Sequence, residues 1–589
     1  MKRIKITIAL AAIMVLSAVF CYGCKTVMND VLIDEKDKTV VITNPDEKKL
    51  EDNKLLYAND DDTSVVVMYL TVSKGNSSEN TNHTWKEINT YSVYDYDEMG
   101  VERYAVNGLL QVGDENGPVE GEVGYGEFVP NATVTIRGQT SSKFKQKNYK
   151  IELKDGKGLY NDQRTINLNK HQRDGIRFRN KISFDILEEI DGMISMQTQF
   201  VHLYVKDETA ENASEAAFVD YGLYTMVEQP NKSYLTRHGL DSNAHLYKIN
   251  FFEFHRYPDV IVLKNDLNYD KKAFEEKIEI KGDDDHSKLI AMLEDVNDTA
   301  MPIKDVVDKW FETDNLFSWL AYQILMGNID TQSRNVFLYS PQNMNTWYFI
   351  SWDFDGDLAI YEDEIQGKSQ EGSWEKGVSN YWGNKLFQRI LKDDELRAML
   401  DDKINEFLKI LTPEMIAEKA NAYAAVVRPY LYRYPDKGYA PLTESEFDSV
   451  VANLPYEIEK NYQNYLDSLE NPMPFFIGRP QQTDTGFVLV WDNAYDFDAE
   501  TVTYRLELSR NLEFTELVDE VRGTLLPVYE YKGTLEPGQY FVRVTATNGS
   551  GKSQTAFDYY VTDGSTKMYG VKCFYVLQDG TIVEDAYAE

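Results

Sequence analysis

The clearest hydrophobic pattern lies in the middle of the chain. An apolar, aromatic run at 317–326 predicts a buried helix. Gly327 and Asn328 predict its end, because both residue types tolerate the left-handed conformation found there. Two further apolar runs, 336–339 and 347–352, predict the strands of a β-hairpin. Outside the turn at 341–345, polar residues gather in the loop before this hairpin and at the end of its second strand.

Elsewhere the periodicity separates two kinds of structure. Strands are predicted at 64–72, 132–153, 199–205, 221–227 and 246–263, whereas helical periodicity dominates at 178–190, 273–326, 384–411, 413–430 and 444–469. Residues 475–563 contain only short, evenly spaced strands separated by turns, which is typical of a β-sandwich. The sequence therefore predicts an α+β domain over 63–470, an all-β, immunoglobulin-like sandwich over 475–563 and a C-terminal tail over 564–589. The role of residues 74–128 is left open.

Composition and charge narrow the range of partners. The chain has 589 residues, of which 42% are hydrophobic and 13% aromatic, enough for two or three domain cores. It has 61 basic and 97 acidic residues, a net charge of −36. Nucleic acid is not expected as a partner, because binding to its phosphates requires basic patches.

The N-terminus predicts export. Basic residues followed by a short apolar segment predict a signal peptide over 1–24, and the acidic stretch 25–62 predicts a flexible linker. Cys24 after a small residue resembles a bacterial lipoprotein cleavage site, which would make Cys24 the lipidated residue and anchor the protein on the outer face of the cell membrane. Cys21 departs from that pattern, so a secreted protein or an uncleaved anchor remains an alternative.

The polar positions around the central hairpin indicate phosphoryl transfer. Asp330 is followed five residues later by Asn335, and Asp353 and Asp355 come directly after the second strand. In protein kinases an Asp and an Asn at this spacing orient the attacking hydroxyl and bind metal, and a later Asp binds the metal at the end of a strand. Carboxylate and amide oxygens also suit Mg²⁺. A solvated loop with an acidic turn is the alternative interpretation.

At these residues the chain resembles the CotH kinase family, which consists of atypical kinases named for a spore coat protein. The motif occurs here as GNID at 327–330, Asn335, and WDFD at 352–355. The resemblance implies an atypical, protein-kinase-like domain of two lobes that transfers the γ-phosphoryl group of ATP to Ser or Thr of proteins. It implies that Asp330 orients the hydroxyl, and that Asn335 and Asp353 bind Mg²⁺ or Mn²⁺ with Asp355 nearby.

The nucleotide would meet the turn and strand that follow Ala132. Within the turn, Arg137, Gly138, Ser141 and Ser142 would cover the phosphates, and the family has a similar RG-x-x-S motif. Strand alternation places Lys147 on the apolar face and Lys150 on the other face. A phosphate-binding lysine must reach a cleft with little water, which favours Lys147, with Lys150 as second choice.

Two further features complete the comparison with the family. Glu228 with the two residues after it resembles the family's hinge, where the backbone would contact adenine. Residues 475–563 resemble a fibronectin type III module, with Trp491 in an early strand and Tyr540 in a late one. Such modules act as spacers or bind surface proteins or polysaccharide.

Two other functions fit the sequence less well. A non-catalytic surface adhesin or scaffold would have no need for Asp330, Asn335 and Asp353 together. A glycoside hydrolase would use paired carboxylates, but the chain has no repeated βα pattern that ends in Glu.

Overall fold

A computed structural model describes residues 31–33, 40–42, 48–210, 215–368, 372–562 and 566–584. The predicted signal peptide and Cys24 lie outside the described residues. Two short strands, β1 (Val31–Ile33) and β2 (Val40–Ile42), pair within the predicted linker. In the ranges above, no helix is both long enough and apolar enough to cross a membrane.

The first lobe is built on an eight-stranded sheet in the order β3-β9-β10-β8-β7-β6-β4-β5. Its strands are β3 (Val65–Ser73), β4 (Ala105–Asp114), β5 (Gly117–Pro118), β6 (Ala132–Arg137), β7 (Asn148–Leu153), β8 (Thr165–Asn169), β9 (Thr198–Asp207) and β10 (Val219–Val227). Because β3 pairs with both β9 and β4, the sheet closes on itself. Alternate side chains point inward and form one hydrophobic core.

Residues 74–128, left open by the sequence, help to fill this closed sheet. Helices α3 (Trp85–Thr90) and α4 (Val93–Met99) each begin with a capping box. Trp85, Ile88, Val93 and Tyr96 of these helices are buried in the core that also contains the inward side chains of β6 and β7. One face of β7 is therefore covered by helices of the same lobe.

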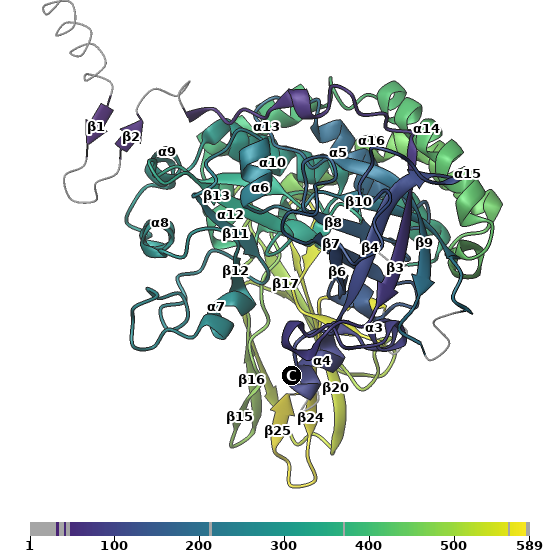
Figure 1. Ribbon diagram of the computed structural model, residues 1–589. Coiled ribbons are helices and arrows are strands. Elements are labelled where there is room, and N and C mark those ends of the chain that lie inside the picture. Colours follow the sequence, from purple (N-terminus) through teal and green to yellow (C-terminus); the bar gives the residue numbers. More distant parts are fainter. Residues whose placement is uncertain are drawn as a thin grey trace, which may run out of the picture.

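The second lobe combines a four-stranded sheet with helices. The sheet has the order β12-β11-β13-β14, with β11 (His245–Ile249), β12 (Ile278–Ile280), β13 (Val336–Ser340) and β14 (Tyr348–Ser351). The helices are α5 (Arg179–Leu187), α6 (Lys232–Arg237), α7 (Lys271–Lys277), α8 (Ser287–Asn297), α9 (Ile303–Trp310), α10 (Thr313–Met326), α11 (Ile360–Ile365), α12 (Lys385–Lys392), α13 (Asp394–Phe407), α14 (Pro413–Leu431), α15 (Glu444–Asn453) and α16 (Glu457–Glu470). Figure 1 shows α10 among these helices, next to α13, and α10 also contacts α16.

Three expectations for this lobe differ from the structure. The region 273–326, predicted to be helical, contains the strand β12 (Ile278–Ile280) directly after α7. The predicted strand region 246–263 contains only β11, and residues 250–270 are irregular. The predicted helix at 384–411 is two helices, because the side chain of Asp393 accepts hydrogen bonds from two backbone N–H groups and starts α13.

The C-terminal residues form a sandwich of two sheets with one shared core. One sheet has the order β15-β16-β19, with β15 (Gln481–Thr483), β16 (Gly486–Val490) and β19 (Val528–Lys532). The other contains β17 (Thr503–Ser509), β18 (Leu517–Thr524), β20 (Gly538–Thr547), β21 (Ser553–Thr555), β24 (Val571–Val576) and β25 (Ile582–Glu584). A separate pair, β22 (Tyr559–Val561) and β23 (Lys567–Tyr569), lies against the helical lobe through Tyr569. The strands β15, β16, β20, β24 and β25 extend below the two lobes in Figure 1.

The predicted tail belongs to this sandwich. β24 pairs with β20 along most of its length, and β25 pairs back onto β24. Phe574 and Val576 alternate along β24 and lie in the sandwich core, whereas Val571, on the other face, packs in a smaller cluster with Phe514 and Phe541. The sheet therefore continues past residue 563 to residue 584.

Candidate active site

The central hairpin brings Asn335 and Asp353 to the same end of the second sheet. Val336 pairs with Ser351, so Asn335 enters β13 beside the point where the chain leaves β14. Both residues have left-handed backbone conformations, with φ of 57° for Asn335 and 63° for Asp353. Asn and Asp tolerate this conformation better than most residues, but it still costs free energy, and such residues cluster at functional positions.

The loop that contains Asp330 is attached to this end of the sheet. Helix α10 ends at Gly327 (φ 72°), where a β-carbon would lie 2.7 Å from Nδ2 of Asn461. Asn328 then donates a hydrogen bond through Nδ2 to the backbone oxygen of Asp353, at 3.3 Å. Asp330 follows within a single 3₁₀ turn, η5 (Ile329–Thr331). The three residues predicted to act together thus lie on adjoining segments.

The closed sheet of the first lobe supplies the opposite wall of a cavity. Arg137 at the end of β6 pairs in register with Asn148 at the start of β7. The cavity has an empty volume of about 430 Å³, including the part open to solvent, a size usual for small-ligand sites. It is lined by Arg137, Gly138, Ser141, Asn148, Asn169, His171, Asn180, Phe184, Val227, Trp352, Asp353 and Asp355.

Opposite charges meet in this cavity. Burial raises the pKa of Asp353 to about 7, and repulsion from Asp355 adds to this effect, while His171, Lys248 and Arg137 oppose it. Burial lowers the pKa of Arg137 to about 10 against the attraction of Asp353. Burial also lowers the pKa of Lys248, against Glu279 and then Asp353. Arg137 and Asp353 therefore face one another in a poorly solvated cavity, and Lys248 lies close enough to interact with both, as phosphate and metal binding require.

Arg137 is held in place by its neighbours. Its guanidinium donates a hydrogen bond to Oδ1 of Asn169 and lies 5.9 Å from the ring centre of Trp352. Asp355 is more exposed than Asp353, and its Oδ2 lies 3.8 Å from Nδ1 of His171. Arg137 thus links the first lobe to the residues that precede Asp353.

Gly138 is required by the shape of the turn. Its φ is 86°, and a β-carbon there would lie 2.0 Å from Oγ of Ser141. Gly138 and Ser141 line the cavity, but Ser142 does not. The Ser142 hydroxyl donates to the oxygen of Gln139 at 2.6 Å and accepts from the N–H of Val93 at 3.0 Å. The hydroxyl of Ser142 thus fixes the turn to α4 and is turned away from the cavity.

The structure does not bring Lys147 to the cavity. Lys147 shares its face of the strand with Tyr149, which is in the core beneath α3 and α4. Its ammonium donates to the backbone oxygen of Ser142, and burial lowers its pKa against the attraction of Asp95 in α4. The expectation that the apolar face lines the cleft was wrong, because helices of the same lobe cover that face.

Lys150 lies on the other face of β7, the face of Asn148 and Arg137. Its ammonium forms an ion pair of 2.6 Å with Glu152, and both side chains are partly exposed. Lys150 is one strand repeat beyond Asn148 and does not line the cavity.

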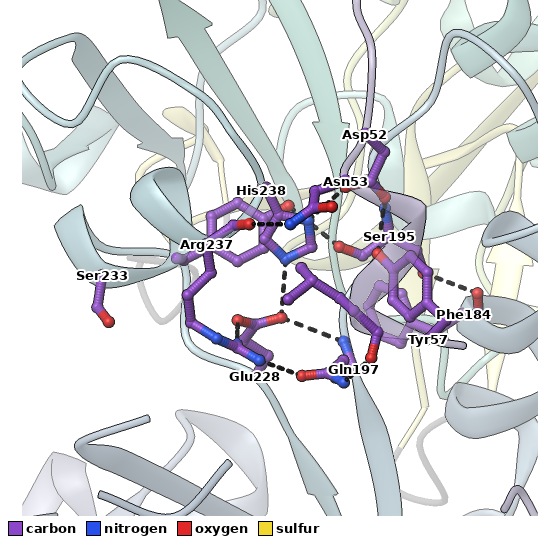
Figure 2. A network of polar contacts seen from close by, with 12 residues as sticks. Asp52, Asn53, Tyr57, Phe184, Ser195, Gln197, Glu228, Ser233, Arg237 and His238 are labelled. Atoms are coloured by element: carbon purple, nitrogen blue, oxygen red, sulfur yellow. Dashed lines mark hydrogen bonds and ion pairs between the residues drawn. The ribbon is translucent and has the colours of Figure 1, made fainter. Parts of the chain in front are cut away.

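The side chain of Glu228 is committed to a buried polar network (Figure 2). Its carboxylate forms an ion pair with Arg237 and accepts from His238 at 3.0 Å. The other ring nitrogen of His238 lies 2.6 Å from Oδ1 of Asp52. Any contact of this region with a nucleotide would come from the backbone, as the hinge resemblance implies, and not from the Glu228 carboxylate.

Asp330 lies at the rim of the site. Its side chain is 53% exposed and forms an ion pair of 2.5 Å with Arg334, four residues later. The guanidinium of Arg334 in turn lies 5.8 Å from the ring centre of Phe251. In this structure the carboxylate that would orient an acceptor hydroxyl is occupied by Arg334.

Several lining residues were not predicted from the sequence. Asn169 ends β8 and His171 lies two residues later, while Asn180 lies on α5. Lys248, on β11, does not line the cavity but interacts electrostatically with Asp353. Asn180 accepts a hydrogen bond from the N–H of Phe354 at 3.2 Å. The polar residues Asn167 and Asn169 in an otherwise apolar strand were the available signal; Lys248 gave none.

The donors present suit a divalent cation that also contacts phosphate. Among the described residues no group of three or more His, Cys, Asp or Glu is arranged to hold a metal ion by itself. Asp353, Asp355 and the amide oxygen of Asn335 offer a small oxygen set. Mg²⁺ commonly uses one or two carboxylates together with phosphates and water, so these residues fit such an ion.

The fold and site define a class: an α+β protein of two lobes, with a charged cavity between a closed sheet and an acidic hairpin. The family model described as CotH kinase protein matches residues 134–465. This is more than half of the chain, which therefore belongs to the CotH kinase family. No curated protein matches the chain. The match begins within β6 and ends in α16, so it includes the predicted site residues from Arg137 to Asp355 and leaves out the C-terminal sandwich.

Proposed function

We propose that the protein is an ATP-dependent protein kinase that phosphorylates Ser or Thr of exported or surface proteins. One observation carries the proposal: Asp330, Asn335 and Asp353 lie on adjoining segments at one end of a sheet, and Asp353 faces Arg137 across a poorly solvated cavity, with Lys248 close enough to attract it. Family membership supports kinase-related chemistry, and the finer assignment rests on these residues.

In the proposed reaction, the acceptor oxygen forms a bond to the γ-phosphorus as the bond to the leaving ADP oxygen breaks. Asp330 orients the acceptor hydroxyl and takes its proton, which requires Arg334 to release the carboxylate. Arg137 and Lys248 neutralise phosphate charge, and the backbone of the turn at Gly138 covers the phosphates. Asn335 and Asp353 would hold Mg²⁺ or Mn²⁺, which offsets the charge that develops on the phosphates.

The same proposal places the protein outside the cell. The N-terminal pattern supports export and lipid attachment at Cys24, and the net charge of −36 is consistent with a soluble surface domain. The sandwich would then be available to surface proteins or polysaccharide.

The test is phosphate transfer by the full chain. Radiolabelled ATP is added with Mg²⁺ or Mn²⁺, and label on the protein and on added protein substrates is measured. Asp330→Asn and Asp353→Asn should each reduce labelling at least about a hundredfold. Asp448, on α15, forms an exposed ion pair with Arg428 of α14, so Asp448→Asn is the matched control and should label normally.

The alternative is a surface scaffold without catalysis, and the Arg334 ion pair that occupies Asp330 favours it. A wild-type chain that neither labels nor binds ATP by calorimetry would establish the scaffold. Labelling that persists in both active-site variants would refute the proposed mechanism.

A further inference from the structure

The C-terminal sandwich reaches the candidate active site through one segment of the helical lobe. This connecting segment, residues 372–384, includes the 3₁₀ turn η6 (Gly377–Tyr381) and leads into α12. One set of its side chains contacts the sandwich, and another set contacts the loop at 328–335 that contains Asp330, here called the Asp330 loop.

The contacts with the Asp330 loop are hydrogen bonds on both sides of Asp330. They run from Nδ2 of Asn380 to the oxygen of Ile329 (3.1 Å), between the hydroxyls of Tyr381 and Thr331 (2.8 Å), and from Nδ2 of Asn384 to the oxygen of Gln332 (2.8 Å). All three donor side chains are at most 2% exposed. Because a buried polar group that loses its partner costs free energy, these bonds restrict where the loop can lie.

The contacts with the sandwich combine aromatic packing and polar bonds. Trp374 donates through Nε1 to the backbone oxygen of Phe557 (3.1 Å) and packs on its ring, with centroids 5.0 Å apart. Glu375 accepts a hydrogen bond from the hydroxyl of Tyr569 (2.5 Å) and forms an ion pair with Lys567 (2.5 Å). The ring of Trp382 packs on that of Tyr495, with centroids 5.2 Å apart. Phe557 and Tyr569 belong to the same hydrophobic core as the helical lobe. Only Gly570 separates Tyr569, at the end of β23, from β24 of the sandwich, so these contacts are covalently close to the sandwich sheet.

The side chains that contact the sandwich and those that contact the loop alternate closely along the connecting segment. Trp382 lies next to Tyr381, and Trp374 is three residues before η6. A shift of the sandwich would therefore displace the residues that hold the Asp330 loop, although sandwich and loop share no bond among the contacts above.

We propose that the C-terminal sandwich is a positioning element for catalysis, which fixes the Asp330 loop through residues 372–384. Tyr381 and Asn380 are its positioning residues. This inference rests on the proposed kinase function for its effect on turnover, but the coupling of sandwich to loop stands on the contacts alone. A partner that binds the sandwich would thereby alter the orientation of Asp330.

The experiment uses the full chain and two readouts. Hydrogen exchange measures the amides of 328–335 and of 553–569, and phosphate transfer measures kcat and the KM for ATP. The variants are Trp374→Ala and the milder Glu375→Gln on the sandwich side, and Tyr381→Phe on the loop side. Trp374→Phe keeps the ring and tests for rescue, and Leu525→Ala, at an exposed turn of the sandwich, is the remote control.

Trp374→Ala should accelerate exchange in 328–335 about tenfold, the loss expected from weakening one or two buried bonds. Its kcat should fall about tenfold while the KM for ATP changes less than about twofold, because the nucleotide wall of the cavity is untouched. Glu375→Gln and Tyr381→Phe should act in the same direction, and Trp374→Phe should restore most of the loss.

Faster exchange in 553–569 with no change in 328–335 would overturn the inference, as would equal effects in Leu525→Ala. If Trp374→Ala does not fold, the same comparison is decided by Glu375→Gln. A wild-type chain that shows the exchange coupling but no phosphate transfer would refute the proposed kinase function and leave the coupling intact.

Discussion

The buried histidine in Figure 2 gives a stability prediction whose size can be worked out from its surroundings. His238 is fully buried, with Oδ1 of Asp52 at 2.6 Å from one ring nitrogen and Oε2 of Glu228 at 3.0 Å from the other. Since each nitrogen faces a carboxylate, both must donate, and the ring is held protonated. The perturbation is His238→Gln, which removes the titrating group.

Burial works to lower the pKa of His238, but the bonds to Asp52 and Glu228 outweigh it and raise the pKa from 6.5 to about 8. This rise corresponds to about 2 kcal/mol of stability. Because the folded pKa is the higher one, the contribution is complete below pH 6.5 and is lost as the pH rises through 8. The advantage of wild type over His238→Gln should therefore shrink by about 2 kcal/mol between about pH 6 and about pH 9.

Hydrogen exchange of the amides at 50–57 and 234–240 measures this locally, which suits a chain with several cores that need not unfold together. The ratio of variant to wild-type rates at each pH cancels the intrinsic effect of pH on exchange. We expect that ratio to fall about thirtyfold across the range. His255→Gln, at an exposed position, is the control and should leave it flat. A constant ratio for His238→Gln would show that the ring is not held protonated, and would refute the reasoning.

Three further predictions concern the cavity. Gly138→Ala should weaken ATP binding, measured by calorimetry, about tenfold or more. Gly156 has a similar φ of 73° but open space around it, so Gly156→Ala should leave ATP binding unchanged. Equal losses in both variants would contradict the steric argument. Arg137→Met should abolish ATP binding while Lys147→Met leaves it within about twofold, since only the former faces the cavity; the reverse result would restore the original assignment. Arg334→Gln should raise turnover by up to about fivefold, because Arg334 competes with the acceptor hydroxyl for the Asp330 carboxylate and their exposed ion pair is weak. A fall in turnover would indicate that Arg334 contacts the phosphates instead.

The sequence alone was sufficient for the features that depend on short spacing. The end of α10 at Gly327, the hairpin after it, and the approach of Asn335 to Asp353 all follow from residues close together in the chain, because a hairpin necessarily brings its two outer ends together. The C-terminal sandwich was likewise predicted from alternation and turn residues, although its last strands lay in the supposed tail.

The tertiary structure alone decided which faces and which distant residues form the site. Alternation on β7 separates Lys147 from Lys150, but it cannot say which face another element covers, and α3 and α4 settled that point. Lys248 joins the site from a distant strand that carries no local signal of its role. The Glu228 carboxylate is not available to the site because it binds His238, a partner that only the folded chain brings near. Period and spacing fix relations within an element, whereas contacts between elements depend on how separate hydrophobic faces are buried together.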